Sequence, residues 1–318
     1  MMKIVILDGY TLNPGDLNWE PITSLGETEI YDRTPQELIL DRVRDADVIL
    51  TNKTVLNKET IDVLPHLKFI AVTATGFNNI DTVAARERGI AVSNARDYST
   101  HSVAQHTIAL MLELIQRSTD HNASVMNGDW GNQEDFCYRL SPSIELADKN
   151  MGIIGFGKIG QRVAGIAQAF GMNILVHRQN TSHPEPPGVR YVSLDTLFKE
   201  SDVISLHLPL TKDNQGFVDK TYLSLMKPGS YLINTSRGPL INESDLFTAL
   251  KNEQIAGAGL DVLTIEPPKE GNPLIGMKNC LITPHQAWAT RESRNRLMHI
   301  VADNIKAFAA GKPINVVN

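Results

Sequence analysis

The chain has only two cysteines in 318 residues, Cys137 and Cys280, and they lie far apart in the sequence. A disulfide framework needs several cysteines, and a structural zinc site needs cysteine or histidine ligands at short, characteristic spacings. Neither pattern is present. We therefore expect two free thiols and no bound metal ion, which excludes proteins held together by disulfides or zinc.

Long apolar runs and an excess of basic charge are also missing. The first apolar run, residues 4–7, is interrupted by Asp8 and is too short for the core of a signal peptide, and no later stretch approaches the length of a membrane span. The 30 lysines and arginines are outnumbered by 36 aspartates and glutamates, which gives a formal net charge of −6. This balance gives no electrostatic footprint for nucleic acid or an anionic membrane. We expect a cytoplasmic protein with neither partner, in which specific groups hold any anionic substrate.

What the sequence does contain is typical of an ordinary globular protein with two domains. Hydrophobic residues make up 42% of the chain and charged residues 21%, so it is long and apolar enough to bury a sizeable core. In the N-terminal part, apolar strand-like runs alternate with helix-compatible segments. The predicted strands are 3–7, 48–50, 69–72 and 90–92, and the predicted helices are 35–45, 60–64 and a longer one at 102–117. This βαβ rhythm carries no glycine fingerprint.

A glycine fingerprint appears later, in the segment Gly155-Phe-Gly157-Lys158-Ile159-Gly160. A short apolar run precedes it and an amphipathic helical pattern at 159–170 follows it, which is the strand–turn–helix context of a dinucleotide-binding loop. In that context Gly155 makes a tight turn, Gly157 lets the backbone approach a pyrophosphate, and Gly160 lets helix and strand pack closely. The alternative is a glycine turn without a ligand.

The fingerprint opens a second βαβ series. Six strands are predicted in it, near 151 and at 173–176, 203–206, 231–234, 258–262 and 281–283, which suits a doubly wound parallel sheet. Asn242 and Asp245 form a helix-start signal for a helix at 243–251, and a closing helix is predicted at 291–310. The cluster of prolines and glycine at 184–188 is interpreted as a turn-rich loop.

Three polar residues follow candidate strands of the second series, where open parallel sheets place their ligand-binding loops. They are Arg237, Glu266 and His285. Taken singly, each has an ordinary structural explanation as a surface charge, a loop acid or a hydrogen-bonded histidine. Together they suit the reduction of a 2-keto acid. A guanidinium can hold a carboxylate through two hydrogen bonds, an imidazole can donate a proton to the carbonyl oxygen, and a nearby carboxylate favours the charged imidazole.

The order of these motifs resembles the D-isomer-specific 2-hydroxyacid dehydrogenase family, and the resemblance runs nearly from end to end. The catalytic arginine, glutamate and histidine of the family fall on Arg237, Glu266 and His285. The matching segments are Thr75-Gly76-Phe-Asn-Asn-Ile-Asp81, Ser102-Val-Ala-Gln-His-Thr107, Gly128-Asp-Trp130, the glycine fingerprint, Leu206-His207-Leu-Pro209-Leu-Thr211 and Asn234-Thr-Ser-Arg237-Gly238-Pro-Leu. The resemblance implies an NAD(P)-dependent oxidoreductase that interconverts a 2-keto acid and its D-2-hydroxy acid.

The resemblance also implies an α/β fold with two doubly wound parallel-sheet domains. Residues 1–99 and 291–318 would form a flavodoxin-like substrate-binding domain, and residues 100–290 a Rossmann domain that binds NAD(P). Backbone N–H groups of Thr75 and Gly76 would help to hold the substrate carboxylate. The expected cofactor contacts are Thr107, His207, Thr235 and Asp261, the last near the nicotinamide amide, together with Gly155, Gly157, Lys158, Ile159 and Gly160 of the fingerprint. For His207 the alternative is a histidine that is hydrogen-bonded at a strand end.

Members of this family usually dimerise through the cofactor domain, so the resemblance implies a homodimer. The irregular segment 128–142 would lie near that interface. The expected partners are therefore a second copy of the chain and a small 2-keto or 2-hydroxy acid.

The sequence departs from the usual NAD-specific pattern after the second strand of the cofactor domain. An acidic residue that bonds the ribose hydroxyls is expected there, but the strand ends in His177 and Arg178. An arginine can pair with the 2′-phosphate that distinguishes NADP, whereas an acid would repel it. We therefore expect NADP(H) to be preferred, with His177 and Arg178 beside the cofactor and Thr181 or Ser182 as further hydroxyl contacts. The alternative is that Arg178 stacks on the adenine of an enzyme that accepts NAD(H).

A second departure follows the candidate catalytic histidine, where Trp288 stands in place of the small residue found in many relatives. The indole would either narrow the substrate pocket or pack as core. With the upstream segment Ala95-Arg-Asp-Tyr-Ser99, it is similar to members of the glycerate dehydrogenase and hydroxypyruvate reductase type, which favours a short substrate such as hydroxypyruvate or glyoxylate. The alternatives are a dehydrogenase for a bulkier 2-keto acid, formate or phosphite, and a dinucleotide-sensing protein that resembles the corepressors built on this scaffold.

Overall fold

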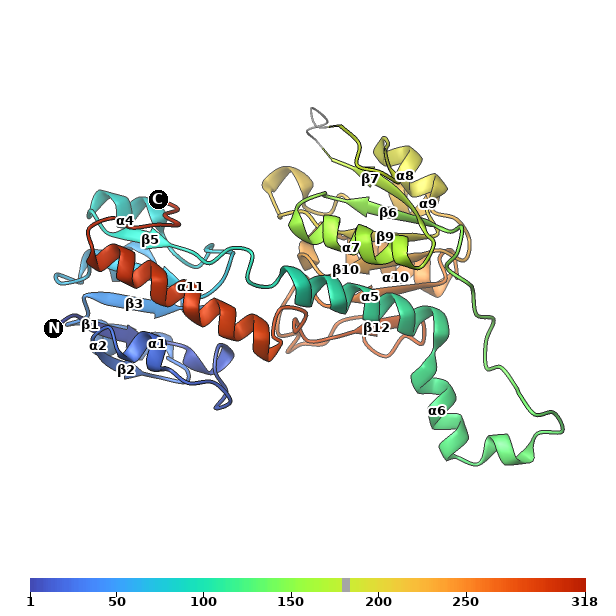
Figure 1. The fold of residues 1–318 in the computed structure, drawn as a ribbon, viewed down its shortest axis with the longest axis horizontal. Helices are drawn as coiled ribbons and strands as arrows, with labels where there is room; N and C mark the ends of the chain where they lie inside the picture. The colour runs from blue at the N-terminus through green and yellow to red at the C-terminus, as the bar shows by residue number, and fades with distance from the viewer. Residues whose placement is uncertain (179–183) are drawn as a thin grey trace. The chain divides into compact units, whose positions relative to one another are not determined.

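A computed structural model of the chain describes residues 1–178 and 184–318. These residues form two compact units (Figure 1). The first unit combines Met1–Ser99 with Trp288–Asn318, and the second consists of Thr100–Ala287. Each unit is an α/β domain built on a parallel sheet, which confirms the predicted fold class. Within the described residues, no helix is both long and apolar enough to cross a membrane.

In the part of the chain that the structure describes, the first unit contains a five-stranded parallel sheet with the order β2-β1-β3-β4-β5. Its strands are β1 (Lys3–Ile6), β2 (Glu27–Ile30), β3 (Val48–Thr51), β4 (Phe69–Val72) and β5 (Ala91–Ser93). This is the flavodoxin-like order, whose switch point lies between β1 and β3. Four of these strands correspond to predicted runs. The remaining one, β2, is a polar strand at the sheet edge, so it carries no apolar signal.

Helices cover both faces of this sheet. They are α1 (Glu20–Thr23), α2 (Ile39–Val43), α3 (Lys58–Asp62), α4 (Thr82–Glu87) and α11 (Arg291–Ala309), together with the 3₁₀ helices η1 (Gly9–Thr11) and η2 (Gln36–Leu38). Alternate residues of a strand face opposite sides, so β1 buries Ile4 and Ile6 beneath α1 and α11, and Val5 beneath α2, α3 and α4. Helix α11 stacks Phe308 on Phe69 of β4, with ring centroids 4.6 Å apart.

The second unit contains, among the residues described, a seven-stranded parallel sheet with the order β12-β11-β10-β9-β6-β7-β8. Its strands are β6 (Asn150–Ile154), β7 (Asn173–His177), β8 (Val189–Tyr191), β9 (Val203–Leu206), β10 (Tyr231–Asn234), β11 (Gly257–Leu260) and β12 (Cys280–Ile282). Counted from β6, the first six strands follow the Rossmann order 3-2-1-4-5-6. The prediction of six strands was wrong by one. Strand β8 follows the cluster 184–188, and its three residues are too few to show a period.

Helices also cover both faces of the second sheet. The helices described in this unit are α5 (Thr100–Gln116), α6 (Ser118–Met126), α7 (Lys158–Ala169), α8 (Leu194–Glu200), α9 (Lys220–Leu225) and α10 (Glu243–Lys251), with the 3₁₀ helices η3 (Asp129–Asn132), η4 (Lys212–Asn214) and η5 (Gly238–Leu240). The buried residues of α5 and α7 join the core on one face, and those of α8, α9 and α10 join the core on the other. Helix α6 and the segment that follows it project away from this sheet (Figure 1).

Helix starts agree with the capping signals in the sequence. Helix α10 begins after Asn242, whose side chain accepts a hydrogen bond from the backbone N–H of Asp245, as the predicted start signal requires. Helix α7 begins directly after Gly157, at the end of the glycine loop. In each parallel sheet the carboxyl ends of the strands and the starts of the following helices share one edge, where open α/β sheets bind ligands.

Candidate active site

The glycine loop lies between β6 and α7, at the switch point of the Rossmann sheet. Gly155 has a φ of +91°, and a Cβ there would clash with the carbonyl oxygen of His207. A Cβ at Gly160 would clash with the carbonyl oxygen of Gly155, whereas a Cβ at Gly157 would meet no atom of the described residues within 4 Å. The first helical residues after the loop are Lys158 and Ile159. Gly155 and Gly160 thus lie close to neighbouring backbone, whereas the backbone at Gly157 is open. This arrangement fits a pyrophosphate on the amino end of α7.

His207 follows β9, beside the glycine loop. Its backbone N–H donates to the carbonyl oxygen of Ile154 over 2.7 Å, and its ring Nε2 lies 2.8 Å from the Ser205 hydroxyl. The ring is therefore hydrogen-bonded at the strand end, and its contact with a cofactor stays a prediction. Burial lowers the pKa of His207 to about 3, so the ring is neutral at physiological pH. His207 therefore adds no positive charge near a dinucleotide phosphate. Backbone N–H groups and cationic side chains would have to bind that phosphate.

Two of the residues expected at the cofactor, Thr107 of α5 and Thr235 after β10, are brought together. Their hydroxyl oxygens lie 2.9 Å apart, and Thr107 also donates to the carbonyl oxygen of Val103 over 2.9 Å. Because a hydroxyl carries one proton, Thr235 is the donor in the pair. Thr107 is fully buried, and its contact with a cofactor stays a prediction.

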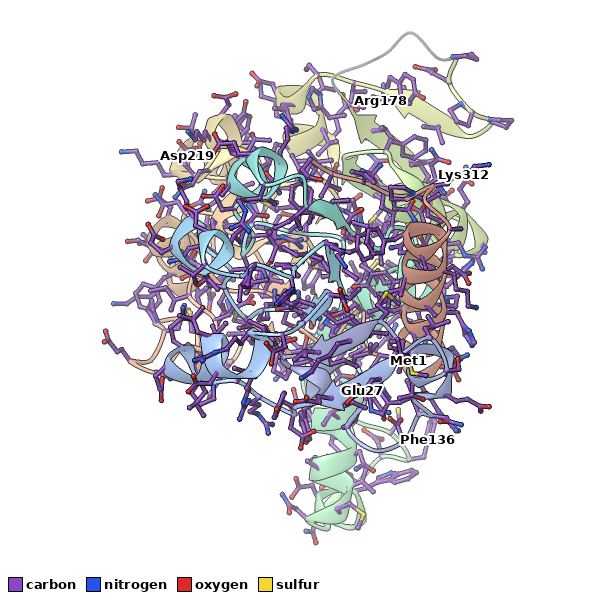
Figure 2. All side chains as sticks on the ribbon, turned by 90° about the vertical axis from the view of Figure 1, so that its left-hand side faces the viewer. Met1, Glu27, Phe136, Arg178, Asp219 and Lys312 are labelled. Carbon is purple, nitrogen blue, oxygen red and sulfur yellow. The ribbon has the colours of Figure 1, made fainter. Side chains whose placement is uncertain are left out.

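Arg178 follows β7, at the position where an NAD-specific domain carries an acid (labelled in Figure 2). Its guanidinium lies 5.8 Å from the centre of the Tyr191 ring on β8, within cation–π range. Nδ1 of the preceding His177 lies 3.1 Å from the carbonyl oxygen of Val192. Strand β8 and the residue after it therefore supply partners for both side chains. The predicted hydroxyl contacts that lie outside the described residues are Thr181 and Ser182.

His285 and Glu266 form a hydrogen-bonded pair. Nδ1 of His285 lies 2.6 Å from Oε2 of Glu266, whose Oε1 accepts from the backbone N–H of Leu263 over 2.9 Å. The side chains of His285 and Glu266 are 31% and 33% exposed, so a small molecule can reach the pair. An ionised carboxylate only accepts hydrogen bonds, so Nδ1 carries a proton, and Nε2 is the ring nitrogen left for proton exchange.

The backbone that carries His285 is constrained. Its φ is +51°, a left-handed conformation that is uncommon for residues other than glycine. Its N–H donates to the carbonyl oxygens of Asp261 and Thr283, over 2.8 and 3.0 Å. The side chain of Asp261 accepts from the next two N–H groups, those of Gln286 and Ala287, each over 2.9 Å. Such a conformation persists only where the surroundings stabilise it. Here Asp261 accepts most of the hydrogen bonds that stabilise it.

Asp261 itself is 1% exposed, directly after β11. Burial alone would raise its pKa, but hydrogen bonds from His106, Thr283 and two backbone N–H groups outweigh burial and lower the pKa. The carboxylate is therefore charged, and both of its oxygens accept hydrogen bonds from within the protein. Its contact with a nicotinamide amide stays a prediction, whereas its role as an anchor for the backbone after His285 is visible in the geometry.

Arg237 follows β10, and its side chain is exposed. Its Nη1 donates to the carbonyl oxygen of Ser236 over 2.7 Å. A Cβ at the next residue, Gly238, would clash with the main chain of Leu263. The loop that carries Arg237 therefore packs, main chain against main chain, on the loop that leads to Glu266.

Thr75 and Gly76 follow β4 in the first unit. The Thr75 hydroxyl donates to the carbonyl oxygen of Ala95 over 2.9 Å, and the Asn94 side chain donates to the carbonyl oxygen of Thr75 over 2.7 Å. These bonds fix the loop. The backbone N–H groups of Thr75 and Gly76 make no hydrogen bond within residues 1–178 and 184–318, so both are available to an anion.

In the sequence Asp8 stands out only as a break in an apolar run, but in the structure it organises the first unit. Its buried carboxylate accepts from three successive backbone N–H groups, those of residues 52–54, over 2.7 to 2.8 Å, and from two threonine hydroxyls. The Asn52 side chain in turn donates to the carbonyl oxygen of Thr73 over 2.9 Å, next to the Thr75 loop. An acid directly after an apolar strand is the signal that could have indicated this role.

Trp288 lies in the first unit. Its indole packs edge-on against Tyr98, with ring centroids 6.1 Å apart, and joins the core beneath α11. The side chain is half-buried. This packing supports the alternative that Trp288 is part of the core, and narrowing of a substrate pocket stays a prediction.

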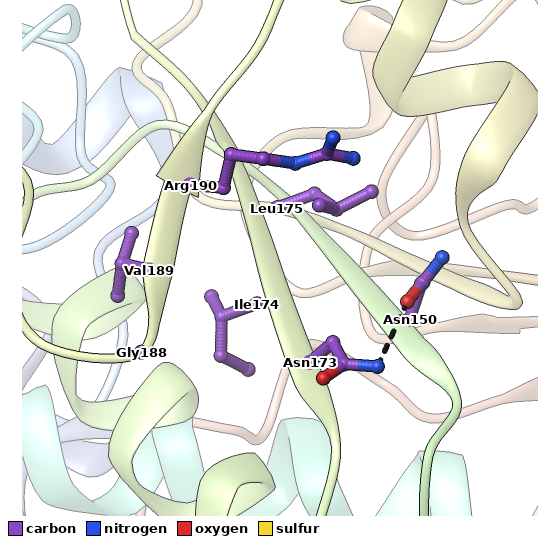
Figure 3. Close-up of a pocket in the computed structure, with 7 residues that line it drawn as sticks. All are labelled: Asn150, Asn173, Ile174, Leu175, Gly188, Val189 and Arg190. Carbon is purple, nitrogen blue, oxygen red and sulfur yellow. Dashed lines mark hydrogen bonds between the residues drawn. The ribbon is translucent and has the colours of Figure 1, made fainter.

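A cavity in the second unit lies apart from these residues, and the described residues offer no metal site. Among the described residues, no group of three or more histidine, cysteine, aspartate and glutamate side chains is placed to hold a metal ion. A cavity of about 410 Å³ lies at the amino ends of β6, β7 and β8 (Figure 3), the sheet edge opposite to the glycine loop. Its lining residues are Asn150, Asn173, Ile174, Leu175, Gly188, Val189 and Arg190. Asn173 donates to Asn150 over 3.2 Å, and Arg190 pairs with Glu200, so these polar groups already have partners.

Known proteins are similar to this chain in both sequence and fold. Residues 108–287 match the family model described as D-isomer specific 2-hydroxyacid dehydrogenase, NAD binding domain. The chain is 48% identical to a hydroxypyruvate reductase from Blautia hydrogenotrophica, with 100% of both chains covered. It is 41% identical to a glycerate dehydrogenase from Methylorubrum extorquens, with 99% of this chain and 98% of the relative covered. Among solved structures, the acyclic imino acid reductase Bsp5 in complex with NADPH and D-Arg has a TM-score of 0.87 at 35% identity, with 100% of both chains covered.

Proposed function

The chain belongs to the D-isomer specific 2-hydroxyacid dehydrogenase family, as an oxidoreductase that interconverts 2-keto and D-2-hydroxy acids with a nicotinamide dinucleotide, and we propose that its substrate is hydroxypyruvate or glyoxylate. The observation that carries the proposed chemistry is the accessible His285–Glu266 pair, with 2.6 Å between Nδ1 and Oε2. The identity of 48% with a hydroxypyruvate reductase supports the short substrate.

The glycine loop before α7 would hold the pyrophosphate of a nicotinamide dinucleotide, which in its reduced form would supply the hydride for the substrate carbonyl carbon. Nε2 of His285 donates a proton to the carbonyl oxygen, which becomes the hydroxyl of the product, and the imidazole is left neutral. Glu266 holds Nδ1–H, which fixes the ring orientation and leaves Nε2 for the proton transfer. Arg237 holds the substrate carboxylate and stabilises charge on the carbonyl oxygen.

A panel of 2-keto acids tests the substrate assignment. Hydroxypyruvate or glyoxylate should be reduced with a higher kcat/KM than phenylpyruvate or 2-ketoisocaproate, because we expect Trp288 to fill space that a larger side chain would need. Initial rates with each acid measure the order, and chiral analysis of the product should find the D isomer. Parallel assays with an added amine test for reduction of imino acids, the activity for which the structural neighbour is named.

Trp288→Ala separates the two interpretations of the indole. If the indole limits the pocket, the variant should raise kcat/KM for the bulky acids about tenfold relative to hydroxypyruvate, within the range of specificity that one apolar group provides. An unchanged ratio would show that Trp288 acts only as core. A wild-type preference for the bulky acids would overturn the substrate proposal itself.

We also propose that the enzyme prefers NADP(H) to NAD(H). Arg178 stands where an acid would bond the ribose hydroxyls, and a charge-assisted hydrogen bond to a 2′-phosphate contributes about 1.5–3 kcal/mol. Because the ring of His207 is neutral, it adds no second positive charge that would attract the 2′-phosphate away from Arg178. Among structural neighbours, Bsp5 is in complex with NADPH and a D-lactate dehydrogenase from Lactobacillus jensenii is with NAD+, so the proposed preference rests on Arg178.

The wild-type enzyme should therefore use NADPH with a kcat/KM at least about tenfold above that for NADH, which requires about 1.4 kcal/mol. Arg178→Asp should reverse this order, because a carboxylate accepts from ribose hydroxyls and repels a phosphate. Arg178→Ala should abolish the preference, whereas Arg190→Ala, on the neighbouring strand β8 where the arginine pairs with Glu200, should keep it. Equal wild-type values, or a preference for NADH, would show that Arg178 does not recognise the phosphate.

We further propose that the chain forms a homodimer through α6 and the segment that follows it. Large exposed apolar side chains gather there, and extended apolar surfaces of this kind mark interaction sites. They are Val125, Met126, Trp130, Phe136 and Leu140. Phe136, labelled in Figure 2, is 89% exposed, yet the segment is ordered by hydrogen bonds such as Trp130 Nε1 to the Phe136 carbonyl oxygen, 3.0 Å. Sedimentation velocity should give twice the chain mass of 35.1 kDa, and a monomer would contradict the proposal.

We also propose that the protein is cytoplasmic. Cys137 is exposed and Cys280 is half-buried, and both are free thiols, as predicted. Reduced thiols are typical of proteins that work in the cytosol.

A further inference from the structure

Helix α5 approaches strand β11 closely, because the strand carries glycine where a side chain would block the helix. A Cβ at Gly259 would lie 3.1 Å from Leu114 and 3.2 Å from Leu110 of α5. Every second residue of a strand and every fourth residue of a helix share a face. The same register places His106, four residues before Leu110, at Asp261, two residues after Gly259.

Three polar side chains are linked by hydrogen bonds in series where α5 meets the end of β11. Nε2 of His106 lies 2.9 Å from the Thr283 hydroxyl, which lies 2.6 Å from Oδ1 of Asp261. The ionised carboxylate can only accept, so Thr283 donates its single proton to Asp261 and has to accept from His106. Nε2 of His106 therefore carries a proton, and it also lies 3.4 Å from Oδ1 of Asp261.

The other end of this chain holds the backbone of the proposed proton donor. The carboxylate of Asp261 accepts from the N–H groups of Gln286 and Ala287, and its carbonyl oxygen accepts from the N–H of His285. Three successive N–H groups thus depend on one residue, at a segment where His285 has a φ of +51°. If a bond in the chain is lost, this strained segment is free to relax, and the imidazole leaves the position set by Glu266.

We infer that His106 is a positioning residue for His285: its Nε2–H donates to Thr283, which fixes Asp261 and the strained segment that carries the proton donor. The inference rests on the role proposed above for His285. Because His106 acts through Thr283 and Asp261, its loss should reduce kcat and leave the binding of substrate and cofactor nearly unchanged.

The test compares two substitutions of His106. His106→Leu removes the donor, whereas in His106→Gln an amide nitrogen takes the place of Nε2. His106→Leu should lower kcat about tenfold, the order of one hydrogen bond, while the KM for hydroxypyruvate and the Kd for NADPH change less than about twofold. His106→Gln should keep most of the wild-type kcat. His66→Leu, at an exposed histidine of the first unit, is the matched control and should leave all three values unchanged.

A second variant and a second measurement make the result decisive. Thr283→Val should lower kcat as His106→Leu does, and the double variant should be no worse than either single variant, because both break the same chain of bonds. In the cofactor-free protein, hydrogen exchange of the Gln286 and Ala287 amides should become about tenfold faster in His106→Leu but not in His66→Leu. This exchange needs no turnover, so an inactive wild-type protein would reject the proposed function and leave the positioning role to be judged by exchange alone.

Unchanged kcat and unchanged exchange in His106→Leu would overturn the inference. A loss of kcat that His106→Gln shares in full would also overturn it, because the donated proton would then make no difference. If His106→Leu does not fold, Thr283→Val and His106→Gln carry the same comparison.

Discussion

Replacement of His285 by glutamine is expected to lower kcat by roughly 10²–10⁴-fold, the contribution of a positioned general acid. Glutamine keeps a polar side chain of similar length but cannot hand a proton to the carbonyl oxygen. The 2.6 Å separation between His285 Nδ1 and Glu266 Oε2 leaves Nε2 as the proton donor, so the loss should fall on the chemical step. Steady-state kcat with saturating hydroxypyruvate and NADPH measures this change.

Cofactor affinity is the control for the His285→Gln variant. The glycine loop follows β6, whereas His285 follows β12, so a fluorescence titration should give nearly the wild-type Kd for NADPH. His66→Gln makes the same change at an exposed histidine of the first unit and should keep the wild-type kcat. Activity of His285→Gln within a few-fold of the wild type would remove His285 from the mechanism.

Replacement of Arg237 by lysine should raise the KM for the keto acid and lower kcat/KM by about one to two orders of magnitude, since a charge-assisted hydrogen bond contributes about 1.5–3 kcal/mol. Lysine keeps the positive charge but presents a point charge in place of a planar fork, so it cannot hold a carboxylate through two parallel bonds. Steady-state rates over a range of hydroxypyruvate concentrations measure both constants.

The Kd for NADPH should stay close to the wild-type value in Arg237→Lys. Arg162→Lys, at an exposed position of α7, is the matched control and should leave the kinetics unchanged. A variant in which only the Kd for NADPH changed would contradict the assignment of Arg237 to the substrate.

Much of the fold could be predicted because buried parallel strands are apolar runs bounded by turns. The predicted runs 69–72, 203–206 and 231–234 agree residue for residue with β4, β9 and β10. The missed strands are those without such a run. Strand β2 is a polar edge strand, and β8 is three residues long, so neither offers a period to recognise.

The candidate site was predictable only in part, for a similar reason. Glycines and charged residues that directly follow apolar runs stand out in the sequence, so Gly155, Arg237 and His285 could be selected, and their catalytic and binding roles are predictions that the variants above test. The position of His106 carried no such signal, because it lies inside a predicted helix, next to apolar residues rather than directly after a strand. Only the packing of α5 on β11 shows that it meets Asp261.

The long helix α11 completes the first unit although the whole second unit, Thr100–Ala287, comes before it in the chain. Its buried residues against the first sheet include Leu297, Met298, Val301, Ala302 and Ile305. During synthesis, the ribosome therefore releases β1 to β5 long before the helix that covers one face of their sheet. The second unit is continuous in sequence, so it can fold before α11 is made. Until then the apolar face of the first sheet stays exposed to solvent. The newly made first unit is the part of this protein that most needs protection from aggregation.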